Sequence, residues 1–345
     1  MKVIYLNHAD GRKPRKLSKL KVKNPTQLFH SLILEIRKIL NISKNDFLSF
    51  SQNTTTSLIK ILIPLLKDNN YKILLDSHEI HWYKTLFIKG RMPINEVTYP
   101  NYAKLRRVPF LKKRVTYFEP NKLAENPGKI LGKKPAIVII SHVSRLTGGI
   151  LLTSKLYKKI KKINPKNIVI VDGSQAVGSM KTRVKTLADI YIGVTSKFIQ
   201  AEPHIGFCWI SSKIVRDFKI KKWDIEPYEF HREIYSAYNC LKTLNEERGV
   251  KTQRSHLKKL LKKAGIPLCQ ISHQIDRLLL VPSNHPTEAV KRLEKMGIII
   301  SSNTGFSVAE PKIPGLRISL SSQLSNKDIK IVVQALVEIK KDGFL

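Results

Sequence analysis

The stretch NIVIVDGSQAVGSM, residues 167–180, runs a series of apolar, mostly β-branched residues directly into the carboxylate of Asp172. Such a run closed by Asp-Gly predicts a central strand of a parallel sheet. Open α/β sheets bind their ligands at the carboxyl ends of these strands, which places Asp172 at a candidate site. The alternative is that Asp172 only caps the segment that follows, as Asp commonly does at a strand-to-helix junction. This stretch alone favours neither interpretation.

Segments of helical and strand-like period alternate around this stretch and predict an α/β fold. Helical spacing of the apolar residues is found in three segments, 28–40, 54–67 and 153–163. Strand-like runs occupy residues 46–52, 71–77, 136–144, 167–174, 188–196 and 206–212. This βαβ order predicts a large domain with a mostly parallel sheet flanked by helices on both faces.

The pattern changes after residue 212 and predicts a second, smaller unit. Residues 229–265 are long, charged and helical, which suggests a bridge between domains. The remainder of the chain alternates short strands and helices, as a small α+β domain does. We therefore predict an N-terminal segment over 1–20, a large domain over 21–240 and a small C-terminal domain over 241–345.

Composition places the chain in a broad class. The three cysteines among its 345 residues have no paired spacing, so we expect neither a disulfide framework nor a metal site, in keeping with a reducing compartment. The first residues lack the apolar core of a signal peptide, and the apolar stretch 57–66 is too short to cross a bilayer. We expect a soluble, cytoplasmic protein without a membrane association.

The charge requires an explanation, because 62 Lys and Arg residues face only 26 Asp and Glu, a formal net charge of +36. A strongly positive field binds polyanions regardless of sequence. The alternative is compositional, since Lys and Ile are abundant along the whole chain. The basic clusters at 104–114, 155–162 and 256–263 do not interleave aromatic residues as a base-stacking surface would. We do not expect nucleic acid as the main partner, and an acidic partner protein is a reasonable expectation.

Several expected strand ends carry groups that can meet above the sheet. Thr54 and Thr55 open a helix, where free backbone N–H groups and hydroxyls suit a phosphate, although ordinary N-capping accounts for one threonine equally well. His78 lies just past a strand, and a single histidine there is usually structural. Arg145 follows another strand, close to glycines that allow a tight turn.

Lys197 completes this set, 25 residues beyond Asp172 and just after another strand-like run. A lysine and an aspartate at neighbouring strand ends suggest pyridoxal phosphate. The lysine of such a pair forms a Schiff base with the cofactor, and the carboxylate keeps the pyridine nitrogen protonated so that the ring accepts electrons. Asp172 is then a functional group and not only a cap.

Six motifs in the same order extend this interpretation over nearly the whole chain. They are YLNHA (5–9), SQNTTTSL (51–58), SHVSRLTGGILL (141–152), VDGSQAVG (171–178), ADIYIGVTSKF (188–198) and GLRISLSSQLSNKDI (315–329). Together they resemble the class V aminotransferase family of fold-type I pyridoxal phosphate enzymes, which includes cysteine desulfurases, kynureninases and isopenicillin N epimerase-like proteins. The resemblance implies a fold-type I large domain with a seven-stranded type of sheet, a small α+β domain and a homodimer.

The resemblance also implies roles for individual residues. Lys197 carries the cofactor as a Schiff base, Asp172 pairs with the pyridine nitrogen, and His78 stacks on the ring. The remaining implied contacts are Gln175 to the phenolic oxygen, Thr54 and Thr55 to the phosphate with Thr195 or Ser196 added, and Arg317 to the substrate carboxylate. The alternative for Arg317 is a surface salt bridge on an edge strand.

Two departures from the family pattern bear on function. Arg145 stands where the family commonly has Asn, so it either binds substrate or turns outward. The stretch 301–319 lacks the mobile-loop cysteine that desulfurases carry there. On this ground we expect an aminotransferase or lyase acting on a free amino acid, and not a cysteine-loop desulfurase. The alternatives are an epimerase or racemase of the same family, or a non-catalytic protein of this fold that binds polyanions.

Overall fold

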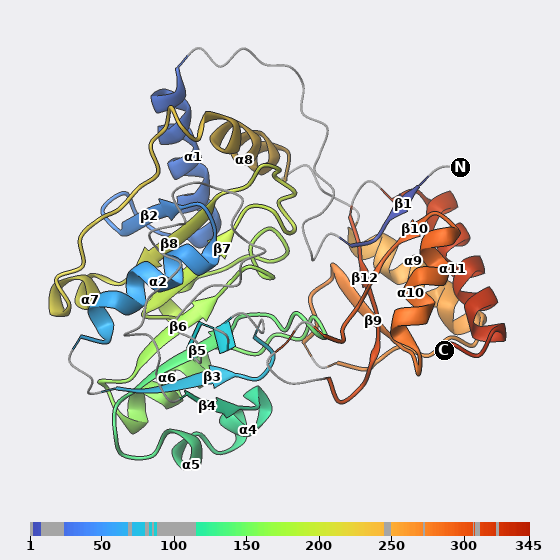
Figure 1. Ribbon diagram of the computed structural model, residues 1–345, viewed down its shortest axis with the longest axis horizontal. Helices are drawn as coiled ribbons and strands as arrows, with labels where there is room; N and C mark the ends of the chain where they lie inside the picture. The colour runs from blue at the N-terminus through green and yellow to red at the C-terminus, as the bar shows by residue number, and fades with distance from the viewer. Residues whose placement is uncertain are drawn as a thin grey trace.

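The structure is a computed structural model, shown in Figure 1. It describes residues 3–7, 24–67, 71–79, 83–84, 86–87, 115–244, 250–271, 273–305, 307, 311–321 and 324–345. Within these residues two bodies of secondary structure lie side by side. One is built around a large sheet, and the other is built from the C-terminal third of the chain together with β1 (Ile4–Tyr5).

The large body holds a seven-stranded sheet in the order β2-β8-β7-β6-β5-β3-β4. Its strands are β2 (Phe47–Ser51), β3 (Lys72–Asp76), β4 (Val115–Phe118), β5 (Ala136–Ser141), β6 (Ile168–Asp172), β7 (Ile190–Val194) and β8 (Gly206–Ile210). Neighbouring strands are parallel except that β8 runs antiparallel to both β2 and β7. The prediction of an α/β fold with a mostly parallel sheet is confirmed.

Helices cover both faces of this sheet, and the strands alternate their side chains between two cores. Val169 and Val171 of β6 belong to the core beneath α1 (Pro25–Leu40), α6 (Ser154–Ile163) and α8 (His231–Leu244). Ile168 and Ile170 belong to the opposite core, beneath α2 (Thr54–Leu65) and α7 (Ser212–Asp217). All five residues of β6 are buried, which explains why its sequence is apolar on both faces.

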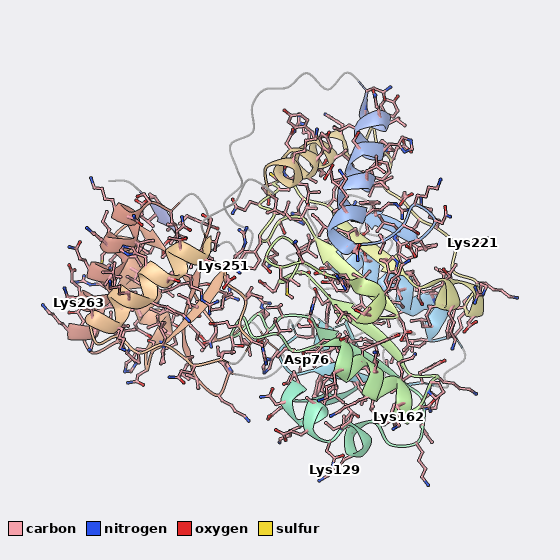
Figure 2. The ribbon with its side chains drawn as sticks, turned by 180° about the vertical axis from the view of Figure 1, so that it is seen from behind. Asp76, Lys129, Lys162, Lys221, Lys251 and Lys263 are labelled. Atoms are coloured by element: carbon pink, nitrogen blue, oxygen red, sulfur yellow. The ribbon has the colours of Figure 1, made fainter. Side chains whose placement is uncertain are left out.

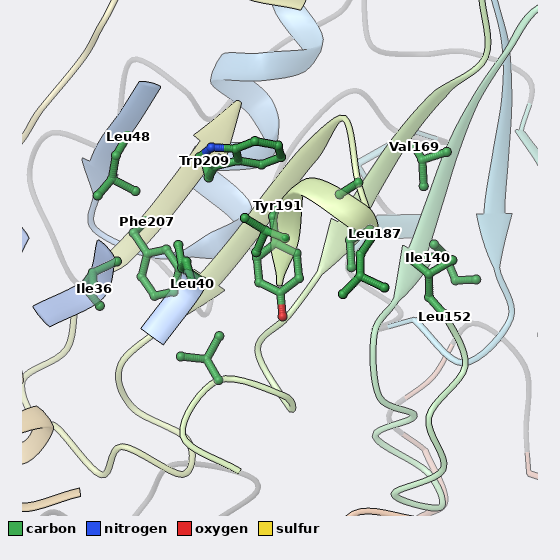
Figure 3. Close-up of a cluster of buried hydrophobic side chains, with 14 of the residues drawn as sticks. Ile36, Leu40, Leu48, Ile140, Leu152, Val169, Leu187, Tyr191, Phe207 and Trp209 are labelled. Atoms are coloured by element: carbon green, nitrogen blue, oxygen red, sulfur yellow. The ribbon is translucent and has the colours of Figure 1, made fainter. Parts of the chain in front are cut away.

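The first of these cores is rich in aromatic side chains. Figure 3 shows Tyr191, Phe207 and Trp209 side by side along the sheet, with Ile36 and Leu40 of α1 close to them. The described part of this body also contains α4 (Pro120–Glu125), α5 (Pro127–Leu131) and a 3-10 turn at Val184–Thr186. The sheet is therefore packed on both of its faces.

The second body contains β9 (Leu278–Pro282), β10 (Ile298–Ile299), β11 (Ser301–Ser302) and β12 (Gly315–Ser319) with the helices α9 (Val250–Lys263), α10 (Pro286–Lys295) and α11 (Asn326–Lys341). β12 is the middle strand of an antiparallel sheet, β11-β12-β9. β1 pairs in parallel with β10. The part of segment 1–20 that the structure describes thus joins the C-terminal body.

Two features differ from the expected pattern after residue 212 and between β3 and β5. The predicted long helical bridge 229–265 consists of two helices, α8 and α9, with residues 245–249 between them outside the described part. The edge strand β4 was not predicted. No helix of the described residues is long and apolar enough to cross a membrane.

The positive charge is spread over the surface. Figure 2 labels Lys129, Lys162, Lys221, Lys251 and Lys263 on the two bodies, and each is exposed. They come from α5, α6, the segment after α7, and both ends of α9. These labelled residues therefore do not gather on one element.

Candidate active site

The carboxyl ends of the parallel strands bring Asp172 and Lys197 to the same edge of the sheet. Asp172 ends β6 and pairs in register with Ser141, which ends β5, and with Ile192 of β7. Lys197 follows three residues after the end of β7. Asp172 is buried and Lys197 half-buried. The topology therefore places the two predicted residues at neighbouring strand ends, as the sequence indicates.

Both oxygens of Asp172 accept hydrogen bonds. Oδ1 accepts the backbone N–H of Ser174 at 2.8 Å, which is the capping contact considered as the alternative role. Oδ2 accepts the hydroxyl of Tyr83 at 2.8 Å. Capping and a function at the site are therefore compatible, because a carboxylate offers about four acceptor positions. Tyr83 was not identified from the sequence, where nothing in its local pattern distinguishes it from a core aromatic residue.

The start of α2 forms the candidate phosphate end of the site. The Asn53 side chain caps the helix by accepting the N–H of Thr56 at 2.8 Å, and Thr54 and Thr55 form the first turn. A Cβ added to Gly206 on β8 would lie 2.4 Å from the carbonyl carbon of Asn53. The glycine thus lets the helix start pack directly on the sheet, and a helix start of this kind favours anions.

His78 lies on the turn after β3, and its position is fixed from two sides. Its backbone N–H donates to Asp76 Oδ1 at 2.8 Å, and its Nδ1 lies 3.0 Å from the Ser144 hydroxyl. Burial lowers the pKa of His78 to about 4, so the ring is neutral near pH 7. Burial also raises the pKa of Asp76 to about 7, although the hydrogen bonds from the backbone N–H groups of His78 and Ser141 act to lower it.

Arg317 and Arg145 meet where the two bodies come together. Arg317 Nη1 donates to the Arg145 carbonyl at 2.7 Å, and its Nε and Nη2 donate to the Ser301 hydroxyl at 3.2 and 2.8 Å. Arg317 is only 1% exposed and lies on a central strand, so the alternative of a surface salt bridge on an edge strand is wrong. Arg145 is also buried and does not turn out into solvent.

The other predicted residues lie in the loops that follow the same strands. Gln175 is buried, three residues after Asp172. The Thr195 hydroxyl accepts the N–H of Ile205 at 2.9 Å and donates to its carbonyl at 3.3 Å, so it braces the turn that carries Lys197. Ser196 is buried next to it. A role of Thr195 or Ser196 toward a phosphate stays a prediction.

A cavity of about 740 Å³ opens beside His78, between the two bodies. The large body contributes Ser77, His78, Leu146 and Thr147, and the C-terminal body contributes residues around Cys269 and Lys312. Lys312 Nζ lies 3.0 Å from Glu119 Oε2, so an ion pair joins the two bodies at this cavity. A small molecule could reach His78 through it.

Comparison with known proteins shows the family of the chain. The model of the family Aminotransferase class-V matches residues 3–225. The chain belongs to the class-V aminotransferase family. The family relation and the mostly parallel sheet confirm the predicted resemblance to fold-type I enzymes.

Individual proteins similar to this chain are largely cysteine desulfurases. The cysteine desulfurase SufS of Plasmodium falciparum (isolate 3D7) is 27% identical over 209 residues, which are 57% of this chain and 36% of that protein. The chain thus spans about a third of the length of this curated relative. Among solved structures, a NifS-like protein superposes with a TM-score of 0.70 at 14% identity, covering 98% of this chain and 99% of its own. An apo cysteine desulfurase from Thermococcus onnurineus NA1 has a TM-score of 0.69 at 14% identity, covering 99% and 95%.

These similarities correct one prediction made from the sequence. The expectation that the protein is not a cysteine-loop desulfurase is contradicted, because sequence relatives and structural neighbours of the chain carry the name cysteine desulfurase. The expectation depended on one missing cysteine in the stretch 301–319. That absence concerns the acceptor of the sulfur, whereas the relation to the family depends on the fold and on motifs along the whole chain.

Proposed function

We propose that the protein binds pyridoxal phosphate and cleaves the carbon–sulfur bond of L-cysteine. The observation that carries the proposal is the position of Asp172 and Lys197 at the ends of β6 and the neighbouring β7. The names of the sequence relative and the structural neighbours support cysteine as the substrate.

The donor set of the site fits the cofactor. Asp172 supplies an anionic acceptor for a pyridinium N–H, and the first turn of α2 at Thr54 and Thr55 supplies donors for a phosphate. Gln175 supplies an amide for the phenolic oxygen, and Lys197 supplies the amine that holds the aldehyde carbon. The cofactor, when bound, supplies an electron-withdrawing ring that stabilises negative charge at the substrate's α-carbon.

Side chains around this set would bind and deprotonate the substrate. Arg317 presents a planar guanidinium suited to a carboxylate, with Arg145 beside it. Lys197 can accept the proton from the α-carbon as a general base and return it to the product. His78 is neutral near pH 7, so it can lie against an aromatic ring without adding charge there.

The bond changes can be balanced with a thiol as acceptor. The carbon–sulfur bond of cysteine breaks, the sulfur passes to a thiol, and the former sulfur-bearing carbon takes a proton to give alanine. Because residues 301–319 contain no cysteine, the thiol comes from elsewhere. A dithiol such as dithiothreitol can take that place in an assay, where it is oxidised as the sulfur is released as sulfide.

The proposal is tested with the purified protein, pyridoxal phosphate, L-cysteine and dithiothreitol. We expect a visible absorption band of bound cofactor, and equal amounts of alanine and sulfide with time. Lys197→Ala should form neither alanine nor sulfide, while the control variant Lys129→Ala, which changes an exposed lysine, should form both. A band without alanine would refute carbon–sulfur cleavage, and formation of an α-keto acid instead would indicate amino transfer. No band at saturating cofactor would refute the whole proposal.

We further propose that the enzyme is a cytoplasmic homodimer that meets an acidic partner protein. The resemblance to the family supports the dimer, and the net charge of +36 supports the acidic partner. Light scattering coupled to gel filtration measures the dimer directly. Association with an acidic partner should weaken steeply as salt rises, because exposed charges are screened.

A further inference from the structure

We propose that Tyr83 is a positioning residue that fixes the orientation of Asp172 and its position relative to the start of α2, as binding of the cofactor requires. The inference rests on the proposed binding of pyridoxal phosphate and adds a residue that neither the sequence motifs nor the family relation assigns. Tyr83 belongs to residues 83–84, which the structure describes as helical, and it is almost fully buried beneath the sheet edge.

The contacts of Tyr83 join the two ends of the cofactor site. Its hydroxyl donates to Asp172 Oδ2 at 2.8 Å, and the Thr54 side chain lies close enough to the same hydroxyl to act on the pKa of Tyr83. Asp172 is the residue proposed to pair with the pyridine nitrogen, and Thr54 opens the helix proposed to hold the phosphate. One phenol therefore binds the carboxylate proposed for one end of the cofactor and lies beside the helix start proposed for the other end.

The geometry gives the hydroxyl a defined effect on the carboxylate. The backbone N–H of Ser174 binds Oδ1 and the phenol binds Oδ2, so the carboxylate cannot rotate about its last bond. Each oxygen keeps a second acceptor position for a ring N–H. The acceptor of the phenol is a charged carboxylate, so this hydrogen bond is stronger than one between neutral groups. It partly compensates the negative charge on Oδ2.

Burial, Asp172 and Glu79 together raise the pKa of Tyr83 well above its usual value. The phenol is therefore a permanent neutral donor across the working range of pH. It neither takes part in proton transfer nor adds a second negative charge beside Asp172. Its role is to orient the carboxylate and to moderate its charge.

The chain contains a matched control for this contact. The hydroxyl of Tyr157 on α6 donates to Asp189 Oδ1 at 3.0 Å, which is the same pair of chemical groups. Asp189 precedes β7, at the opposite end of that strand from the Lys197 turn. Tyr157→Phe therefore removes an equivalent phenol–carboxylate bond away from the proposed cofactor.

The experiment titrates pyridoxal phosphate into the wild-type protein, Tyr83→Phe and Tyr157→Phe, and follows the visible band as a function of pH. We expect Tyr83→Phe to raise the Kd of the cofactor about tenfold, as loss of a charge-assisted hydrogen bond would. The midpoint pH of the spectral change of the bound cofactor should also rise. Without the phenol, Asp172 carries more of its negative charge, and this charge favours the protonated form of the cofactor. Tyr157→Phe should change neither quantity.

Two comparisons keep the proposal open to refutation. In an Asp172→Asn background, Tyr83→Phe should have little further effect on the Kd, and an equal effect in both backgrounds would overturn the role through Asp172. If circular dichroism shows that Tyr83→Phe does not fold, 3-fluorotyrosine at position 83 replaces it, and the more acidic phenol should shift the band's midpoint downward. An unchanged midpoint would overturn the inference. Absence of any band in the wild-type protein would instead refute the proposed function.

Discussion

Gly206→Ala tests whether the start of α2 holds the cofactor's phosphate. A Cβ at residue 206 would lie 2.4 Å from the carbonyl carbon of Asn53 and 2.6 Å from its Cα and its oxygen. Ordinary contacts of a Cβ begin near 3.4 Å, so the strand and the helix start must separate by about 1 Å. All three neighbouring atoms belong to the backbone, so no side chain can rotate away to relieve the contact.

The displacement predicts two measurable effects. Overpacking of this kind costs about 1–3 kcal/mol, so the midpoint of thermal unfolding should fall by several degrees. Moving the N–H groups of Thr54 and Thr55 by about 1 Å weakens their bonds to a phosphate, and we expect the Kd of pyridoxal phosphate to rise tenfold to a hundredfold. The fall in the midpoint and the rise in Kd are followed by circular dichroism and by spectral titration.

The control is Gly128→Ala on α5, where the nearest atom to an added Cβ is the Asn126 side-chain oxygen at 3.9 Å. Alanine is the better helix former, so this variant should keep or slightly gain stability and bind the cofactor normally. If Gly206→Ala lost stability but retained the wild-type Kd for pyridoxal phosphate, the assignment of the phosphate to α2 would be refuted.

Three further predictions concern the buried His142, the buried Arg317 and the N-cap of α11. Burial lowers the pKa of His142 to about 4, so its protonation opposes folding. The wild-type protein should lose about 1.4 kcal/mol of unfolding free energy per pH unit between pH 6.5 and 4, because only its unfolded state binds a proton at residue 142. His142→Gln lacks this loss, so the difference in unfolding free energy between the wild type and the variant should shrink by that amount as the pH falls, measured by urea unfolding at each pH. Arg317→Lys replaces a planar guanidinium, whose paired N–H groups match a carboxylate, by a single point charge, so the KM of the amino acid should rise at least tenfold with little change in the Kd of pyridoxal phosphate, and an unchanged KM would exclude Arg317 from substrate binding. Ser325→Ala removes the capping box of α11 and should cost about 1 kcal/mol in thermal unfolding with unaltered cofactor binding.

The central strands were predictable because both of their faces are buried. β5 and β6 are apolar at nearly every position, and this continuous pattern is visible without any knowledge of their neighbours. β4 lies at the edge of the sheet and exposes Thr116 and Tyr117, so it lacks that pattern. β1 has only two residues, and its partner β10 lies more than 290 residues away. Short strands with distant partners leave no local signal.

The site residues also differ in whether a local sequence pattern or a distant contact reveals them. Asp172 and Lys197 could be located because each follows a recognisable strand, and the topology of parallel strands then brings their ends together. Tyr83 could not, because its importance comes from a contact with Asp172, 89 residues later in the chain. The burial of Arg317 depends likewise on a hydroxyl and a carbonyl supplied by other segments.

The mistaken exclusion of desulfurase chemistry has a related physical origin. In the proposed function, deprotonation of an amino acid at its α-carbon depends on groups that must be held rigidly around one ring, and Asp172 and the start of α2 are the groups proposed for this. A thiol that receives sulfur need only approach the product side of the cavity, and it can belong to a different segment or molecule. A missing cysteine in one stretch therefore says little about the bond that breaks. The rigid groups constrain the sequence much more strongly, and their pattern is the one that the chain shares with its family.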